Sequence, residues 1–398
     1  MKNFIFMSPN FPDNYWHFCA ELKKNGLRVL GIGDCPYDEL KPELKDSLHE
    51  YYKVSSLENY DEVFRAVAFL TFKYGKIDWL ESNNEYWLER DAALRTEFNI
   101  TTGPKTPDMV RIKHKSAMKA YYEKAGIPTA RYHLVYDYEP AKAFAHMVGY
   151  PVVVKPDNGV GANNTYKLRS DEDLDYFFAT KDDNIYIMEE FVKGEVRTFD
   201  AIIDSKGEVI FETGNVTLGS LMDVVNDNDN SLYYMVKNLP EQMKDFGRRT
   251  VKSFEVKSRF VHLEFFVLRE DQEGLGKKGD IIGLEVNMRP SGGYSPDMYN
   301  FANEVDVYKI WADMVAYDRS TVPLDRPHHY CAFCGRRDGK NFVMDHDAIM
   351  AKYGHCMKMH GRIPEALSGA MANQMYMANF DTEEEMNQYY ADLLRTHN

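Results

Sequence analysis

The sequence predicts an α/β fold of the α+β type, in which a small parallel βα domain precedes mostly antiparallel sheets. Two observations support this prediction. The first hundred residues alternate strand-like apolar runs with helical runs, which is the order expected for a parallel sheet. Beyond about residue 190, strand-like runs follow one another across polar turns, which is typical of antiparallel strands. A chain of 398 residues also favours several domains or subdomains over one compact core.

The N-terminal region is predicted to end at a linker over 101–108, TTGPKTPD, which is dense in Thr, Gly and Pro. Before this linker, helices are expected over 16–26 and 59–75. The expected strands of the sheet are 2–8, 27–34, 49–54 and 77–82. Residues 1–108 are therefore assigned to an N-terminal βα domain.

The elements after the linker follow in order. A helix is predicted over 109–126, where the terminal glycine gives a common stop signal. Further helices are expected over 170–180 and 239–254. Strands are expected over 150–156, 165–169, 184–192, 195–204, 207–218, 261–268 and 280–288. The final part, 325–398, alternates strand and helix again.

The amino-acid composition limits the kinds of partner that the protein is expected to bind. The formal net charge of −14 argues against nucleic acid or an anionic membrane surface as the main partner, because both require basic patches. No apolar run approaches the roughly 18 residues needed to cross a bilayer. Five cysteines spread over a long chain form no disulfide framework. A cytoplasmic protein is therefore expected.

Cys331 and Cys334 raise the alternative of a zinc site, since several more candidate ligands lie nearby in sequence. These are His328, His329, His355, Cys356 and His360. The segment HHYCAFCG is predicted to be a strand, on which positions 331 and 334 face opposite ways, and no second CxxC motif follows. Ordinary packing is the favoured interpretation of the two cysteines.

A polar row stands out in residues 283–293, GLEVNMRPSGG. Glu285, Asn287 and Arg289 occupy every second position, so on a strand they share one face while the apolar residues between them are buried. If this strand pairs with 261–268, Glu264 lies beside Glu285. Two carboxylates and an amide oxygen are hard ligands suited to Mg²⁺, and the arginine suits a phosphate or carboxylate. A solvated polar face of an amphipathic strand remains the alternative.

A second group of residues precedes this row. Lys155 ends a β-branched strand and is followed by the loop DNGVGANN, whose backbone N–H groups suit phosphate oxygens. Lys115 on the preceding helix is a second candidate cation. In the run IYIMEEFV, Glu189 would accept a hydrogen bond from an adenine amino group, and the backbone near Val192 would read the ring edge. Each feature alone has an ordinary structural explanation, and the ordered series carries the prediction.

This ordered series of motifs resembles the ATP-grasp superfamily. It is most similar to the carboxylate–amine ligase branch, which includes biotin carboxylase, D-alanine–D-alanine ligase and the L-amino-acid ligases. The resemblance covers roughly residues 110–295, and the E-x-N-x-R row after an upstream strand glutamate is its most specific part. It implies an ATP-grasp fold with a lid and nucleotide subdomain at 109–190, a metal and catalytic subdomain at 191–320 and a C-terminal α/β subdomain at 321–398.

The resemblance also implies a role for each matching residue. Two Mg²⁺ ions, with Mn²⁺ as an alternative, would be held by Glu264, Glu285 and Asn287, while Arg289 and Lys155 would be catalytic. The implied ATP contacts are Lys115, Lys155, Gly159, Gly161, Glu189, Glu190, Phe191, Val192 and Glu195. Glu195 stands one place before the position where the family has a ribose-binding acid, and Val196 occupies that position. The candidate substrate contacts are Glu85, Arg197 and Tyr294.

The function implied by the resemblance is ATP-dependent formation of an amide bond between a carboxylate and an amine through an acyl phosphate. Small molecules, amino acids among them, would be the substrates, and a homodimer is a candidate assembly. Three alternatives stay open: a carboxylating enzyme of the purine pathway, an amino-acid ligase that modifies proteins and a non-catalytic nucleotide-binding module. A protein kinase is disfavoured, because the Gly-rich loop follows the lysine and no H-R-D motif precedes the DFG at 245–247.

Overall fold

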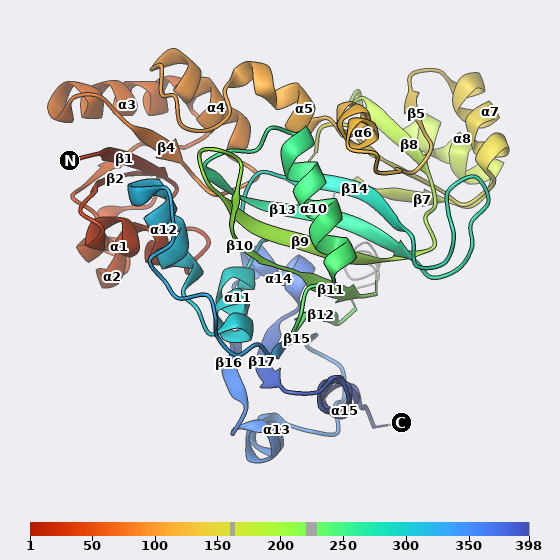
Figure 1. Ribbon diagram of the computed structural model, residues 1–398. Helices are drawn as coiled ribbons and strands as arrows, with labels where there is room; N and C mark the ends of the chain where they lie inside the picture. The colour runs from red at the N-terminus through yellow and green to blue at the C-terminus, as the bar shows by residue number, and fades with distance from the viewer. Residues whose placement is uncertain (160–163, 220–228, 398) are drawn as a thin grey trace.

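The N-terminal region forms the predicted parallel sheet. The computed structural model describes residues 1–159, 164–219 and 229–397. Four parallel strands lie in the order β3-β2-β1-β4, in the region drawn in red and orange in Figure 1. The strands are β1 (Asn3–Met7), β2 (Arg28–Gly33), β3 (Glu50–Lys53) and β4 (Trp79–Glu81). The helices are α1 (Trp16–Lys24), α2 (Pro42–Ser47), α3 (Tyr60–Tyr74) and α4 (Leu88–Glu97), with a 3₁₀ turn at Tyr37–Glu39.

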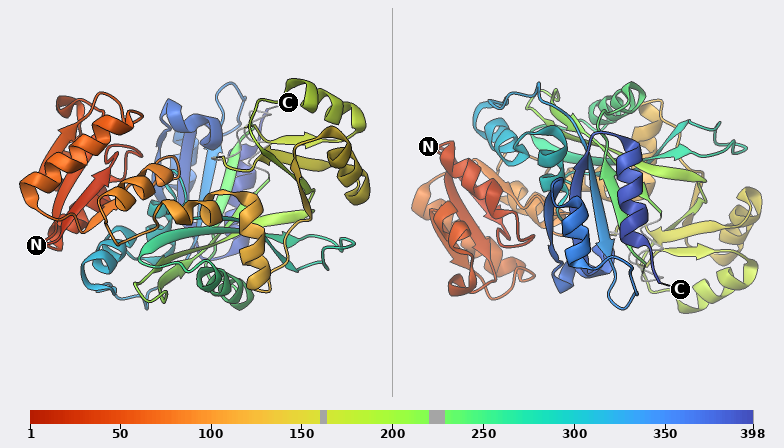
Figure 2. Two further views of the ribbon diagram at one scale, coloured as in Figure 1. Left: turned by 90° about the horizontal axis from the view of Figure 1, so that it is seen from above. Right: turned by 90° about the horizontal axis from the view of Figure 1, so that it is seen from below.

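A second, antiparallel sheet of four strands lies at the other end of the molecule (Figure 2). Its order is β5-β8-β6-β7, and α7 and α8 pack on it. The elements are β5 (Tyr132–Val135), α7 (Tyr138–Val148), β6 (Val152–Pro156), β7 (Tyr166–Leu168), α8 (Asp171–Thr180) and β8 (Tyr186–Glu190). A 3₁₀ turn at Thr106–Asp108, α5 (Met109–Lys113) and α6 (Lys115–Lys124) connect the two ends. The helix predicted over 109–126 is thus two helices.

The largest sheet lies between these two regions and has the order β14-β13-β9-β11-β12-β15-β17-β16, with β10 paired to β9. Its strands are β9 (Gly194–Ile203), β10 (Val209–Thr213), β11 (Asn215–Leu218), β12 (Ser231–Met235), β13 (Arg259–Leu268), β14 (Ile281–Asn287), β15 (Tyr330–Arg336), β16 (Met357–Arg362) and β17 (Gln374–Phe380). The helices that accompany it are α10 (Glu241–Ser253), α11 (Ser295–Asn303), α12 (Val307–Tyr317), α13 (His346–Tyr353), α14 (Glu365–Met371) and α15 (Glu383–Leu394). All pairings within the sheet are antiparallel.

The alternation along β9 and β13 explains why helices cover both faces of this sheet. Phe199 and Leu263 point to one face, where they form a cluster with residues of α6 and α10. Ile202 and Phe260 point to the other, where Trp311 of α12 and residues of the N-terminal sheet complete a second cluster. The central strands are therefore buried on both sides over much of their length.

The C-terminal strands continue the same sheet. β15, β17 and β16 join it through β12, so the described strands after residue 320 belong to the same sheet as β9 to β14. Cys331 and Cys334 are both fully buried and belong to different apolar clusters on the two faces of β15. This placement agrees with ordinary packing of the two cysteines. Among the described residues, no helix is long and apolar enough to cross a membrane.

A buried ion pair network joins the N-terminal sheet to the large sheet. Glu81, at the end of β4, accepts from Arg95 of α4 at 2.9 Å and also pairs with Arg259 of β13. All three side chains are almost completely inaccessible. Burial raises the pKa of the Glu81 carboxyl, but the two arginines outweigh burial and lower it. The carboxylate is therefore ionised and holds two buried cations.

We expect Glu81→Gln to lower the free energy of unfolding by roughly 3–5 kcal/mol, because it removes the carboxylate that pairs with the buried Arg259 and leaves Arg95 with only Asp91, 3.9 Å away. Urea denaturation followed by tryptophan fluorescence measures the change. Glu270→Gln is the matched control, since its pair with Lys193 is more than half exposed and should contribute no more than about 1 kcal/mol. An unchanged urea midpoint for Glu81→Gln would contradict the prediction.

Candidate active site

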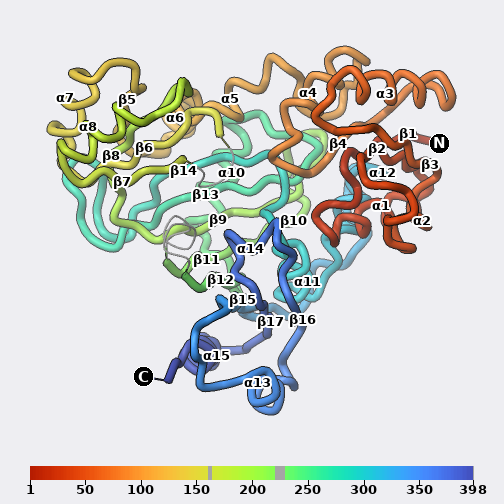
Figure 3. Tube along the Cα trace, turned by 180° about the vertical axis from the view of Figure 1, so that it is seen from behind, coloured from red at the N-terminus to blue at the C-terminus, as the bar shows by residue number. Residues whose placement is uncertain are grey.

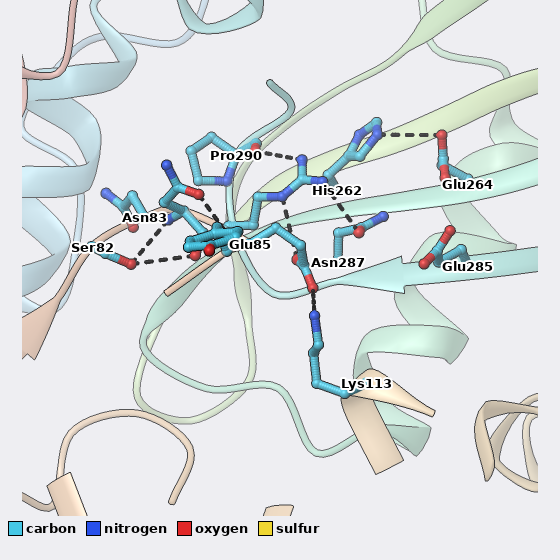
Figure 4. A network of polar contacts seen from close by, with 12 residues as sticks. Ser82, Asn83, Glu85, Lys113, His262, Glu264, Glu285, Asn287 and Pro290 are labelled. Atoms are coloured by element: carbon cyan, nitrogen blue, oxygen red, sulfur yellow. Dashed lines mark hydrogen bonds and ion pairs between the residues drawn. The ribbon is translucent and has the colours of Figure 1, made fainter. Parts of the chain in front are cut away.

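The polar row predicted on β14 faces the polar residues of β13. The two strands pair antiparallel, with Glu264 opposite Glu285 and His262 opposite Asn287, so the expected pairing of the two glutamates is confirmed. Figure 4 shows these four side chains along the same side of the two strands. The register places two carboxylates and an amide oxygen next to one another on the sheet.

His262 is tied into this row by acids on two strands. Its Nδ1 lies 2.6 Å from Asp200 of β9, and its Nε2 lies 3.6 Å from Glu264. Burial lowers the pKa of an imidazole, but the two carboxylates outweigh burial and raise the pKa of His262 to about 9. The imidazolium is in turn the main group that, against burial, lowers the pKa of Glu264. In this arrangement, the positive charge of His262 balances the negative charges of Asp200 and Glu264.

Three lysines approach the row from α6 and β6. Lys115 Nζ lies 3.1 Å from Glu285, and Lys155 Nζ lies 2.6 Å from Glu189 of β8. Lys119, one helical turn after Lys115, pairs with the other oxygen of Glu189. Burial raises the pKa of the Glu189 carboxyl, but Lys119 and Lys155 outweigh burial and lower it to about 2. The two predicted phosphate lysines thus lie beside the glutamates of the site.

Arg289 meets a residue of the N-terminal domain. Its Nε lies 3.4 Å from Glu85, which also accepts from Lys113 at 2.7 Å, and Figure 4 shows the latter contact. Arg289 also donates to the side chain of Asn287 at 3.3 Å. Burial opposes ionisation of Glu85, but Arg289 and Lys113 outweigh it and lower the carboxyl pKa. The loop after β4 therefore reaches the end of the polar row.

The segment after β8 is held in place by its own side chains. Glu190 accepts from the backbone and side-chain nitrogens of Arg131, at 2.8 and 2.7 Å. The carbonyl of Phe191 accepts from Gln272 at 3.0 Å, and Val192 is buried in a small apolar cluster. The backbone of residues 190–192, which was predicted to bind adenine, thus runs between the small sheet and the large sheet.

Two residues that were predicted to contact ligands, Glu195 and Arg197, lie away from the polar row. Glu195 and Arg197 bind one another at 2.7 Å, and the register with β13 puts both on the face of β9 opposite to Glu264. Val196 faces the same side as Glu264, so the structure does not bring Glu195 to the polar row. Tyr294 is half-buried at the start of α11.

The glycine loop after β6 is described in part. Lys115 Nζ donates to the carbonyl of Gly159 at 3.4 Å, so the start of the loop lies beside the lysines. Gly161 lies outside the described residues.

Lys113 and Lys119 are site residues that were not predicted. Lys119 lies four residues after Lys115, a spacing that places both on one helix face, and this spacing is a usable signal. Lys113 has no such signal, because its partner Glu85 comes from a distant loop. Lys113 neutralises Glu85, a predicted substrate contact, and Lys119 neutralises Glu189, a predicted ATP contact.

We expect the stability of the protein to depend on Glu189 in acid. Because its folded pKa is about 2, below the ordinary value of 4.5, its contribution is complete above pH 4.5 and is lost as the pH falls toward 2. At neutral pH, the ionised carboxylate of Glu189 should contribute about 3 kcal/mol to the free energy of unfolding. The difference in unfolding free energy between the protein and Glu189→Gln should therefore shrink over this window, as urea titrations at several pH values would measure.

Asp61→Asn is the control for this pH series, since Asp61 pairs with Arg65 on the exposed side of α3. The difference between the protein and this control variant should stay small throughout. A pH-independent difference for Glu189→Gln would contradict the assignment of the lowered pKa.

Comparison with known proteins places the fold. No protein-family model matches the chain. The chain is 23% identical to the L-arginine-specific L-amino acid ligase of Bacillus subtilis over 240 residues. The match covers 58% of this chain and 56% of that relative. The chain thus spans about half the length of that relative.

Several solved structures match along nearly the whole chain, among them an L-amino acid ligase and a biotin carboxylase domain. An L-amino acid ligase from Bacillus licheniformis superposes with a TM-score of 0.73 at 15% identity, covering 99% of this chain and 97% of the other. The biotin carboxylase domain dimer of the Hydrogenobacter thermophilus 2-oxoglutarate carboxylase, solved with MgADP, ADP and bicarbonate, gives 0.70 at 16% identity, covering 99% and 89%.

The chain therefore has the ATP-grasp fold, with the small and large antiparallel sheets flanking the polar row. The relatives point to the carboxylate–amine ligase family within it, which confirms the resemblance drawn from the sequence motifs.

Proposed function

We propose that the protein is an ATP-dependent ligase that joins a small carboxylate to an amine, with an amino acid as one substrate. The observation that carries the proposal is the register of β13 and β14, which aligns Glu264, Glu285 and Asn287 opposite the lysines of α6 and β6. Phosphoryl transfer requires charge neutralisation around the transferred group, and this arrangement supplies it from both sides.

The residues of the polar row fit magnesium. Glu264 and Glu285 are hard oxygen donors on adjacent strands, and each is balanced by a cation, His262 at 3.6 Å and Lys115 at 3.1 Å. Asn287 adds a neutral oxygen donor beside them. Mg²⁺ held by these oxygens would neutralise charge on the β- and γ-phosphates of ATP. We propose that these residues would hold two such ions, which would supply this charge neutralisation.

Lys155 and Lys115 would hold the phosphates. Both ammonium groups contact glutamates, so bound phosphate would compete for the same ammonium groups. The backbone of residues 190–192 and Glu189 would hold the adenine between the small and the large sheet.

The reaction proposed has two steps. In the first, the γ-phosphorus–oxygen bond of ATP breaks and the phosphoryl group joins a substrate carboxylate oxygen, giving an acyl phosphate and ADP. In the second, the amine nitrogen attacks the acyl carbon and loses a proton, and phosphate leaves. Because water competes with the amine, the site must exclude water during the second step.

Arg289 and Glu85 would bind the substrates. Arg289 can direct its guanidinium at an acyl phosphate oxygen, and Glu85 carries a negative charge that suits a substrate ammonium group. Their contact joins the N-terminal domain to the polar row, so the substrate pocket would lie between the two.

The experiment is ADP release by the purified protein with MgATP, screened against pools of amino acids, dipeptides and small carboxylic acids. Mass spectrometry would identify the amide product of an active pool. A pool that holds bicarbonate and amines but no other carboxylate tests a carboxylating reaction, in which an amine nitrogen accepts the carboxyl group; the bicarbonate in the biotin carboxylase relative makes this the second candidate. ATP binding with no ADP release in any pool would favour a non-catalytic module, and absence of ATP binding would overturn the proposal.

A further inference from the structure

A separate polar cavity lies in the C-terminal part of the large sheet. It has a volume of about 290 Å³ and is lined by residues of β15, the start of α13, the end of β16 and the start of β17. Four cations, Arg336, Arg337, Lys340 and Arg362, line it against two carboxylates. In a chain of net charge −14, this local excess of positive charge is unusual.

Three of these cations are already engaged. Arg362 forms two hydrogen bonds with Asp338, at 2.7 and 2.6 Å. Lys340 pairs with Asp229, and Arg337 donates to main-chain carbonyl groups, one of them that of Asp229 at 2.9 Å. These three positive charges therefore have internal partners.

Arg336 is different. The residue is only 7% exposed, and its guanidinium stacks on the ring of Phe342 at 3.7 Å. Within the described part of the chain, its side chain has no hydrogen bond and no carboxylate within 4 Å. The second carboxylate of the cavity, Asp345, instead accepts from the backbone of Ala348 at the start of α13. Burial lowers the pKa of the Arg336 guanidinium, and Asp345, which lies beyond ion-pair distance, offsets this only in part, so a bound anion would supply a closer counter-charge.

The cavity is distinct from the candidate active site. Residues directly opposite one another on neighbouring strands share a sheet face, and the pairs from β9 to β15 are Arg197–Val216, Val216–Tyr234 and Tyr234–Ala332. Ala332 therefore lies on the same face as Arg197. Arg336, four residues later on the same strand, also lies on that face. That face is opposite to the one that carries the polar row. Figures 1 and 3 show α13, which borders the cavity, at the far end of the molecule from α6, β13 and β14.

We propose that this cavity is a binding site for the phosphate or carboxylate group of a small molecule, with Arg336 as the residue that binds it. The planar guanidinium offers a fork of N–H donors that matches both oxyanions, and Phe342 holds its plane. A volume of about 290 Å³ is enough to hold the anionic group of a small molecule. This inference does not depend on the proposed ligase activity.

Calorimetric titration of the full chain with inorganic phosphate and, separately, with malonate tests the site at constant ionic strength. We expect saturable binding of one anion per chain at this cavity, separate from any binding to the lysines of the active site, and the anion that binds identifies the ligand as a phosphate or a carboxylate compound. Arg336→Met should weaken binding by roughly tenfold or more. Lys155→Met, which alters the ATP site, should leave this binding in place.

Arg248→Met is the matched control, because that arginine pairs with Glu212 on the surface outside the cavity. It should bind the anion as the unaltered protein does. If circular dichroism shows that Arg336→Met is unfolded, Arg336→Lys replaces it, and binding should weaken several-fold because the fork geometry is lost. No saturable binding of either anion, or equal affinity in the Arg336 variant, would overturn the proposal.

Discussion

Glu285→Gln is expected to fold normally and to lose ADP release by roughly a thousandfold. The substitution keeps the shape of the side chain but removes the charge that faces Lys115 and stands beside Glu264. A neutral amide holds Mg²⁺ far more weakly than a carboxylate, so charge on the transferring phosphoryl group would no longer be balanced. Initial rates at saturating MgATP, with the substrate pool that activates the protein, measure the loss.

The control for this variant is Glu212→Gln. Glu212 is also a strand glutamate of the large sheet and also pairs with one cation, Arg248, but it lies on β10 away from the polar row. Its rate should remain within about twofold, because surface ion pairs contribute little. Normal turnover by Glu285→Gln would remove the basis for the metal assignment.

Arg289→Lys is expected to lower kcat by roughly a hundredfold while the KM for ATP stays nearly constant. Lysine keeps the positive charge beside Glu85, but it lacks the planar fork that would bind an acyl phosphate. The loss should therefore fall on the chemical steps and not on nucleotide binding. Steady-state kinetics with ATP and carboxylate varied separately distinguish the two.

A matched variant for this prediction is Arg248→Lys, which alters an arginine on the surface of α10 and should leave both kinetic constants unchanged. A rise in the KM for ATP with unchanged kcat for Arg289→Lys would mean that Arg289 binds nucleotide and not the reacting carboxylate.

The polar row itself could be predicted from sequence alone. Strand side chains alternate with a period of two, so Glu285 and Asn287 share one face of β14, whereas Arg289 lies in the bend that follows the end of the strand. The alternating pattern of the preceding strand identified Glu264 as the partner, and the register confirms it. The parallel N-terminal sheet was likewise determined by local strand and helix signals.

Contacts between distant segments were decided only by the tertiary structure. Glu85 reaches Arg289 because the loop after β4 lies against the end of β14, and no local period encodes that approach. The same holds for Glu81 with Arg259, for the continuation of the large sheet into β15–β17 and for the cavity at Arg336. Local sequence determines which face a side chain occupies, whereas the path of the whole chain determines what that face meets.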